Sequence, residues 1–212
     1  MPSVVDWGRV EYVAALDRMR ALVAARRRGA IDDTLIFVEH PPVVTIGIEG
    51  DDGAAERSGL PVVRVERGGK STYHGPGQLV GYPIVDLGAR HRDVRRFVHE
   101  LEGVIIASLR PFGVRGEHVS GRRGVWVDGE RKIASIGIAV DHWVTFHGFA
   151  LNVDVDLTAF ASFHPCGFDG NVMTSLRAEL GRPVGIDEVR PVVQREWVRV
   201  FATPLAAPPA VA

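Results

Sequence analysis

Apolar residues recur along much of the chain at the three- and four-residue spacing that is typical of amphipathic helices. The first such stretch begins at Tyr12 and ends in three arginines before Gly29, as expected where basic side chains favour the negative helix end. In the last stretch, Pro191 weakens the helix prediction unless it lies in the first helical turn. The spacing predicts four helices, over residues 12–28, 94–108, 174–180 and 187–201.

Shorter apolar or alternating stretches predict strands between these helices. Pro41 and Pro42 separate two of them, which we expect to pair. Asp128-Gly129 suits the tight turn of a hairpin, and the Gly-rich segment 67–78 is expected to be a loop between two strands. Without regular βαβ alternation, the order of elements favours an α+β fold with a largely antiparallel or mixed sheet. The predicted strands cover residues 35–39, 43–48, 62–66, 79–87, 125–127, 132–140 and 142–153.

Composition excludes several classes of protein. The 212 residues include 25 basic and 26 acidic side chains, a net charge of −1 that argues against a nonspecific nucleic-acid binder. Apolar runs such as 104–107 and 136–140 are far shorter than the roughly 20 residues of a membrane span. The first residues lack the pattern of a secretion signal, so we expect a cytoplasmic protein. No linker divides the chain, which predicts one domain over 1–203 and a disordered tail over 204–212.

The chain has a single cysteine, Cys166, which rules out an internal disulfide. Pro165 and Gly167 predict a turn that would present its thiol on a loop, where nucleophiles often lie. A lone cysteine is also commonly a small buried hydrophobe. A thiol with an ordinary pKa of about 8.5 is only slightly ionised at neutral pH, so catalysis would need a neighbouring cation or base.

Lys132 is one candidate for that neighbour. Counting by twos along its strand places it on the face of Ala134, Ile136, Ile138 and Val140, which would direct its ammonium group inward. Alternatively, it marks the frayed and solvated start of the strand. Three histidines are rival bases, each of which could equally be a structural residue: His74, His147 and His164.

Small residues predict room for a ligand. Ser135, Gly137 and Ala139 share one face of a strand, and Gly148 and Ala150 share a face of the next strand. The space could hold an apolar ligand, although small residues also occur where a helix packs closely on a sheet. The Gly-rich segment could cradle a phosphate or form a simple turn, but it lacks the known phosphate-loop patterns. No metal-ligand motif is present in the sequence, so we expect no catalytic metal.

Four segments together resemble the octanoyltransferase family of lipoate biosynthesis. They read RGGKSTYHGPGQLVGYP at 67–83, GVWVDGERKIASIG at 124–137, WVTFHGFALNV at 143–153 and HPCGFDGNVMTSL at 164–176. The similarity covers most of residues 30–180. It implies the fold of the biotin/lipoate protein ligase catalytic domain, α+β, with a mostly antiparallel or mixed sheet flanked by helices.

The resemblance also implies an activity, its partners and its site. The family moves an octanoyl group from acyl carrier protein to a lysine on lipoyl domains of 2-oxoacid dehydrogenases and on the glycine cleavage H protein. It needs no cofactor beyond the carrier's phosphopantetheine arm. Cys166 matches the acyl-thioester nucleophile and Lys132 the residue that lowers the thiol pKa, while Lys70 departs from the acidic or polar residue expected after RGG. The substrate-binding matches are Arg67, Gly68, Gly69, Lys70, Ser71, Thr72, Tyr73, His74, Ser135, Ile136, Gly137, Gly148, Phe149 and Ala150.

Three alternatives stay open at the level of sequence. An ATP-dependent lipoate or biotin protein ligase would share the fold, and a lipoyl-relay amidotransferase would use an octanoylated protein as donor. A noncatalytic acyl-carrier-binding module would keep the fold without turnover. If carrier protein is the donor, basic groups should guide its docking. The candidates, which could equally be solvated surface residues, are Arg92, Arg95, Arg96, Arg122, Arg123 and Arg131.

Overall fold

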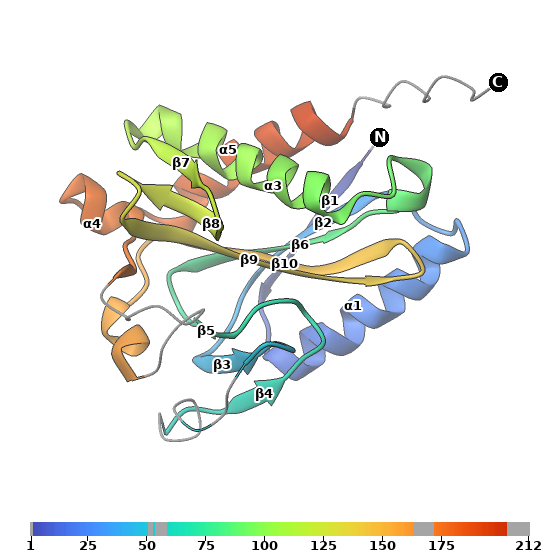
Figure 1. Cartoon of the computed structure of the whole chain (residues 1–212), viewed down its shortest axis with the longest axis horizontal. Helices are drawn as coiled ribbons and strands as arrows, with labels where there is room; N and C mark the ends of the chain where they lie inside the picture. The colour runs from blue at the N-terminus through green and yellow to red at the C-terminus, as the bar shows by residue number, and fades with distance from the viewer. Residues whose placement is uncertain (1, 51–52, 54–58, 163–171, 203–212) are drawn as a thin grey trace.

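The computed structural model describes residues 2–50, 53, 59–162 and 172–202. Its centre is a seven-stranded sheet in the order β1-β2-β6-β10-β9-β8-β7 (Figure 1). β1 runs parallel to β2, and every other neighbouring pair is antiparallel, so the sheet is mixed as predicted. The strands are β1 (Ser3–Arg9), β2 (Thr34–Glu39), β6 (Gln78–Ile84), β7 (Gly116–Val119), β8 (Arg122–Val127), β9 (Arg131–Asp141) and β10 (Val144–Asn152).

A second, three-stranded sheet corrects two predictions. It has the order β4-β3-β5, with β3 (Val43–Ile46) parallel to β4 (Val62–Arg64) and antiparallel to β5 (Ser71–His74). The expected pairing of 35–39 with 43–48 is wrong, because β2 belongs to the large sheet and β3 to the small one. The Gly-rich segment is also more than a loop, since β5 lies inside it.

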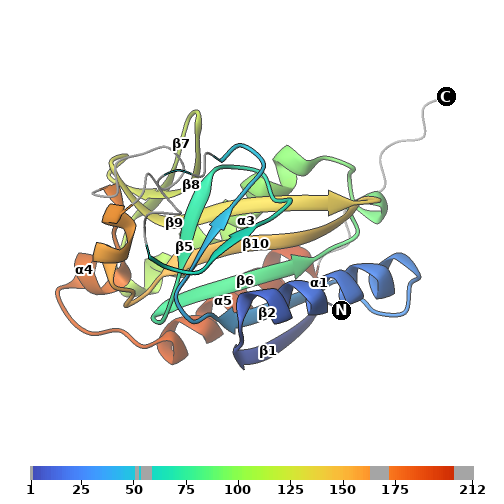
Figure 2. The same ribbon diagram turned by 90° about the horizontal axis from the view of Figure 1, so that it is seen from below.

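The helices were predicted correctly in position, and they cover both faces of the large sheet. α3 (Val94–Leu109) and α5 (Ile186–Phe201) pack on one face, and α1 (Tyr12–Arg27) packs on the other (Figures 1 and 2). Pro191 lies beyond the first turn of α5, so the condition placed on it was too strict. The remaining helical segments are α4 (Leu176–Leu180) and the 3-10 turns η1 (Leu87–Ala89), η2 (Arg110–Phe112) and η3 (Leu157–Ser162).

The two faces of the large sheet each carry a buried core, and a third apolar cluster, which includes Ile46 and Phe160, lies with the small sheet. Leu101 and Trp197 belong to the core between the sheet and α3 and α5, whereas Met19 and Tyr82 belong to the core beneath α1. The small sheet lies on the α1 side of the large sheet (Figure 1). α1 and the small sheet therefore both cover this face. The site described below lies between the large sheet and the small sheet, with α1 at its side. Among the described helices, none is long and apolar enough to cross a bilayer.

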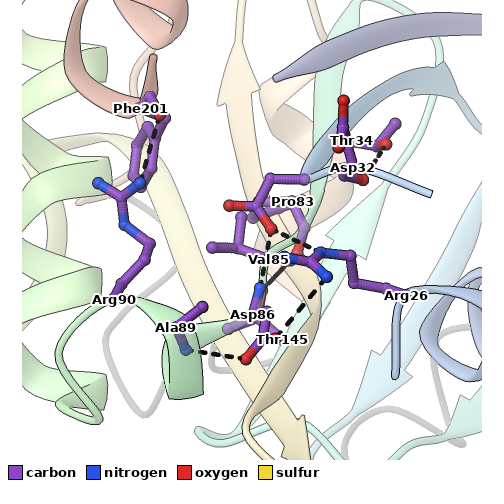
Figure 3. A network of polar contacts seen from close by, with 11 residues as sticks. Arg26, Asp32, Thr34, Pro83, Val85, Asp86, Ala89, Arg90, Thr145 and Phe201 are labelled. Atoms are coloured by element: carbon purple, nitrogen blue, oxygen red, sulfur yellow. Dashed lines mark hydrogen bonds and ion pairs between the residues drawn. The ribbon is translucent and has the colours of Figure 1, made fainter. Parts of the chain in front are cut away.

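A polar network connects the C-terminal end of α1 to the large sheet. The Arg26 side chain donates to Asp33 Oδ1 over 2.8 Å. It also lies 3.7 Å from a carboxylate oxygen of Asp86 (Figure 3). Asp33 also accepts the backbone N–H of Asp86 at 3.0 Å, and Asp86 accepts that of Ala89 at 3.2 Å. These contacts tie α1, the start of β2 and the end of β6 together. The predicted single domain over 1–203 stays a prediction, and the predicted tail lies outside the described residues.

Candidate active site

A cavity lies between the α1 face of the large sheet and the small sheet. Its floor is formed by paired residues of β9 and β10, in which Gly137 faces Gly148 and Ser135 faces Ala150. The two small-residue faces predicted from the sequence are therefore one continuous surface. The cavity is lined by Tyr12, Arg67, Gly68, Gly69, Thr72, His74, Val80, Tyr82, Ser135, Ile136, Gly137, His147, Gly148, Phe149 and Ala150.

Glycine at 137 permits a close approach between the Gly-rich segment and β9. A Cβ atom at this position would lie 2.9 Å from both Arg67 Cδ and the Gly68 carbonyl oxygen. The Gly68 N–H donates to the Ile138 carbonyl at 3.0 Å, which holds the segment against the strand. A side chain at 137 would therefore push this wall of the cavity outward.

The Arg67 guanidinium is buried in the cavity wall, where it organises the backbone. Nη1 donates to the Lys70 carbonyl at 2.8 Å, and Nη2 donates to the carbonyl and hydroxyl oxygens of Thr45 at 2.9 and 2.8 Å. These bonds join the Gly-rich segment to β3. The shape of the wall therefore depends on Arg67, whatever the side chain contributes to a bound ligand.

His74 belongs to a buried chain of hydrogen bonds with Gln78 and Asn152. The Asn152 amide donates to the Thr174 carbonyl at 2.9 Å, and its oxygen accepts from Gln78 Nε2 at 2.9 Å. Gln78 Oε1 must then accept, so the 2.8 Å contact is a bond donated by His74 Nδ1. The other ring nitrogen, Nε2, lies 3.4 Å from the Thr45 hydroxyl. Burial holds the pKa of His74 well below its usual range, which agrees with this neutral ring.

A second polar cluster lies where α1 meets the cavity. The Tyr12 hydroxyl is 3.3 Å from His147 Nδ1, and His147 Nε2 is 3.7 Å from a Glu66 carboxylate oxygen. Burial raises the pKa of Tyr12 to about 12 and lowers that of His147 to about 4. His147 also has a left-handed backbone conformation, with φ of 56°, which is uncommon outside glycine. Because its pKa is lowered, the buried His147 side chain is neutral at ordinary pH.

Lys132 lies on the opposite face of β9 from the one we predicted. In the hairpin Ala134 pairs with Val125, but Lys132 pairs with Trp126, so Ile133 is an extra residue, a β-bulge. Since neighbouring residues of β8 face opposite ways, Lys132 shares the face of Ser135 and Gly137. The regular alternation of side chains between the two faces of a strand does not hold across a bulge.

The inward direction of Lys132 is nevertheless confirmed. The residue is only 2% exposed, and its Nζ lies 5.6 Å from the centre of the Trp126 ring. The alternative of a solvated, frayed strand start is therefore wrong. The chain returns beside Lys132 after the segment 163–171, because Thr174 N–H donates to the Lys132 carbonyl at 3.0 Å and Met173 bridges the same residue. Cys166 and His164 lie outside the described residues.

Only some residues of the Gly-rich segment line the cavity. Thr72 and His74 line the cavity, whereas Ser71 and Tyr73 alternate with them on β5 and are absent from the lining. Tyr73 packs edge-on against Phe160, with the ring centres 5.4 Å apart. Lys70 is exposed.

Three lining residues escaped the sequence analysis: Tyr12, Val80 and Tyr82. Tyr12 had no distinguishing signal, because it reads as the first apolar residue of an amphipathic helix. Val80 and Tyr82 do alternate along β6 in the sequence, but nothing there shows that β6 lies beside β10. A long-range strand pairing brings them to the cavity.

Comparison with known proteins decides the family. Residues 11–198 match the model of the lipoyl protein ligase A/B catalytic domain. An octanoyltransferase of Geobacter sulfurreducens is 43% identical over 98% of this chain and 88% of its own length. One of Mycolicibacterium gilvum is 49% identical over 89% of this chain and 81% of its own. The chain belongs to this family, among the octanoyltransferases.

The fold agrees with that assignment. A lipoate-protein ligase A with bound ATP superposes with a TM-score of 0.74, over 98% of this chain and 89% of that one, at 18% identity. The expected ligase-type catalytic fold is therefore confirmed. For an octanoyltransferase, the small-residue cavity and the buried Lys132 on the same face of β9 are the features whose chemistry has to be explained.

Proposed function

We propose that this octanoyltransferase transfers an octanoyl group from acyl carrier protein to a lysine of lipoyl domains, through a thioester on Cys166. The observation that carries the proposal is the burial of Lys132 on the same strand face as the small-residue floor of the cavity. An ammonium group beside a thiol stabilises the thiolate and so lowers the pKa of the thiol.

The chemistry then runs in two balanced steps. The Cys166 thiolate attacks the octanoyl thioester, forming one S–C bond while the carrier's C–S bond breaks, and the Lys132 ammonium protonates the departing thiolate. In the second step the target lysine amine attacks the Cys166 thioester, and neutral Lys132 accepts a proton from that amine. A thioester is exchanged for a thioester, and then for a more stable amide. ATP is therefore not needed, and no cofactor is required beyond the carrier's phosphopantetheine arm.

The cavity suits the octanoyl chain. Ala150 and Val80 give it apolar side chains, and the paired glycines at 137 and 148 leave its floor free of side chains. We assign the transferred chain to this space. In this proposal, the segment 67–74 acts mainly by shaping the cavity wall.

Arg95 is the best supported of the six candidate docking arginines. It is exposed and lines a groove that meets the acyl cavity at Gly68 and Gly137. The side chains of Arg96 and Arg131 lie within 2.9 Å of Glu100 and Glu179. Arg123 contacts Glu49 at 3.1 Å. Arg92 and Arg122 lie over the rings of Trp143 and Trp126.

The likeness to curated octanoyltransferases at 43–49% identity favours this reaction over ATP-dependent ligation. A noncatalytic carrier-binding module has no need of a buried lysine on the cavity side of the sheet. We also assign lipoyl domains of the 2-oxoacid dehydrogenases and the glycine cleavage H protein as acceptors, and the cytoplasm as the place of reaction.

Intact-protein mass spectrometry tests the proposal. Incubation with octanoyl carrier protein alone should add one octanoyl mass to Cys166, and a lipoyl domain added afterwards should remove it. Cys166→Ser should show no adduct. Lys132→Met, which removes the charge at similar volume, should slow acylation about 100-fold or more, whereas loss of the exposed cation in Arg28→Ala should not. Unmodified Cys166 during turnover, or AMP release from ATP and free octanoate, would refute the scheme.

A further inference from the structure

A second cluster of reactive side chains lies on the opposite side of the large sheet from the acyl cavity. His99 and Glu102 are one turn apart on α3, and His118 lies on β7. His118 Nδ1 is 2.8 Å from Glu102 Oε2, and His99 Nδ1 is 3.9 Å from the same oxygen. The two imidazole rings stack with centres 4.0 Å apart. One ligand atom from each residue lies within 4.8 Å of the others.

The carboxylate of this cluster is held in place by the fold. Glu102 is buried, and its second oxygen, Oε1, accepts the backbone N–H of Gly124 at 2.8 Å. Gly124 has φ of 104°, a conformation that side-chain-bearing residues rarely adopt. The bond leaves Oε2 directed at both histidines, as an outer hydrogen bond orients the carboxylate of a metal site.

We propose that His99, Glu102 and His118 bind a divalent transition-metal ion, with Zn²⁺ as the reference ion. Two imidazole nitrogens and one carboxylate oxygen are ligands suited to Zn²⁺, Co²⁺ or Ni²⁺, whereas Mg²⁺ prefers an all-oxygen shell. Metal–ligand bonds of about 2.0–2.2 Å require the three atoms to move slightly together. The exposed His99 side chain, 69% accessible, can supply that movement.

Binding requires a change of tautomer at His118. In the metal-free protein, the short contact between His118 Nδ1 and Glu102 is a hydrogen bond donated by the imidazole. A metal ion bound at Nδ1 takes the place of this proton, and the neutral ring then carries its proton on Nε2. A neutral imidazole therefore releases no net proton, and no oxidation or reduction is involved. Arg95, Arg122 and Arg123 line the groove that His99 and Glu102 also line, with Glu49 beside Arg123, so their positive charge opposes the cation. We therefore expect micromolar rather than nanomolar affinity.

The ion would join α3 to β7 beside the groove that adjoins the acyl cavity. This groove shares Gly68, Ile136 and Gly137 with the cavity, although the histidines themselves are absent from the cavity lining. Occupancy of the metal site is thus separable from acyl transfer. Failure of one proposal leaves the other standing.

Calorimetric titration of tag-free protein with ZnCl₂ tests the site. The titration uses a Cys166→Ser background, because a free thiolate is itself a strong zinc ligand. One equivalent should bind, and MgCl₂ should give no binding. His99→Ala and His118→Ala should each weaken binding at least tenfold. His142→Ala is the matched control, because it removes an equally exposed histidine outside the cluster and should leave the affinity unchanged.

Co²⁺ absorption gives a second readout. The parent protein should show d–d bands of a nitrogen and oxygen ligand set that vanish in His118→Ala. Glu102→Gln keeps an acceptor for Gly124 and should fold while binding more weakly. The proposal is overturned if the parent binds no zinc at millimolar concentration, or if His99→Ala and His118→Ala bind as the parent does.

Discussion

Replacing Asn152 tests whether the buried hydrogen-bond chain beneath the cavity stabilises the fold. Asn152→Leu has a similar volume but offers neither a donor nor an acceptor. It removes the donor to the Thr174 carbonyl and the acceptor for Gln78 Nε2, both at 2.9 Å. All three residues are buried. The substitution leaves the Thr174 carbonyl and one N–H of Gln78 without a partner, while Gln78 Nε2 keeps its other bond, to the Tyr73 carbonyl at 3.2 Å. At about 1–3 kcal/mol for each lost partner, the free energy of unfolding should fall by about 2–6 kcal/mol.

Asn152→Ala separates this loss from a simple packing effect. The shorter side chain leaves a polar space in which water can reach both orphaned groups. We therefore expect Asn152→Ala to be less destabilising than Asn152→Leu, the reverse of the order expected for an apolar core position. Gln194→Leu, which removes an exposed amide on α5, should change stability by less than about 0.5 kcal/mol.

Urea denaturation followed by tryptophan fluorescence gives the three free energies. A loss below about 1 kcal/mol for Asn152→Leu would mean that the amide contributes little to stability, because a lost buried bond normally costs at least that much. If alanine proved more harmful than leucine, the donor and acceptor assignment would be refuted in favour of packing.

Three further predictions concern the cavity, pH and the α1 network. Gly137→Ala should reduce octanoyl transfer more than acetyl transfer in competition assays, because its Cβ would lie 2.9 Å from Arg67 Cδ; equal losses would contradict a role in the acyl space. Burial lowers the pKa of both His40 and His147 to about 4, so stability should be lost as pH falls from about 6.5 towards 4, where the unfolded chain binds more protons. His40→Gln should flatten that decline in urea titrations, and an unchanged slope would count against it. Arg26→Ala should cost about 1–3 kcal/mol in the same assay by leaving the partly buried Asp33 carboxylate without its charged partner, and a change within error would show the ion pair to be dispensable.

Local pattern predicted the helices and the β8–β9 hairpin because their signals are short-range. Each helix has its apolar face and end signals within one segment, and the hairpin is closed by Asp128-Gly129. β1 was missed because its residues are largely exposed at the sheet edge and show no regular alternation. The pairing of 35–39 with 43–48 failed because adjacency in sequence does not determine which sheet a strand joins.

The candidate site could be predicted where side chains alternate regularly between the two faces of a strand. Ser135 and Gly137 pair with Ala150 and Gly148, so the two faces of small residues necessarily meet once β9 and β10 are neighbours. The contribution of Tyr12 was not predictable, because nothing near it in the sequence indicates that α1 covers this part of the sheet.

Lys132 shows why one extra residue matters to the chemistry. With strict alternation, its side chain would enter the apolar core formed with α3 and α5, where an ammonium group would lie among side chains that cannot solvate it. The bulge at Ile133 leaves Ile133 itself in that core and turns Lys132 to the cavity side of the sheet. Bulges often re-aim a side chain next to an active site. The bulge therefore sets the position of the proposed proton donor, and it explains why the inward direction of Lys132 could be predicted for a partly wrong geometric reason.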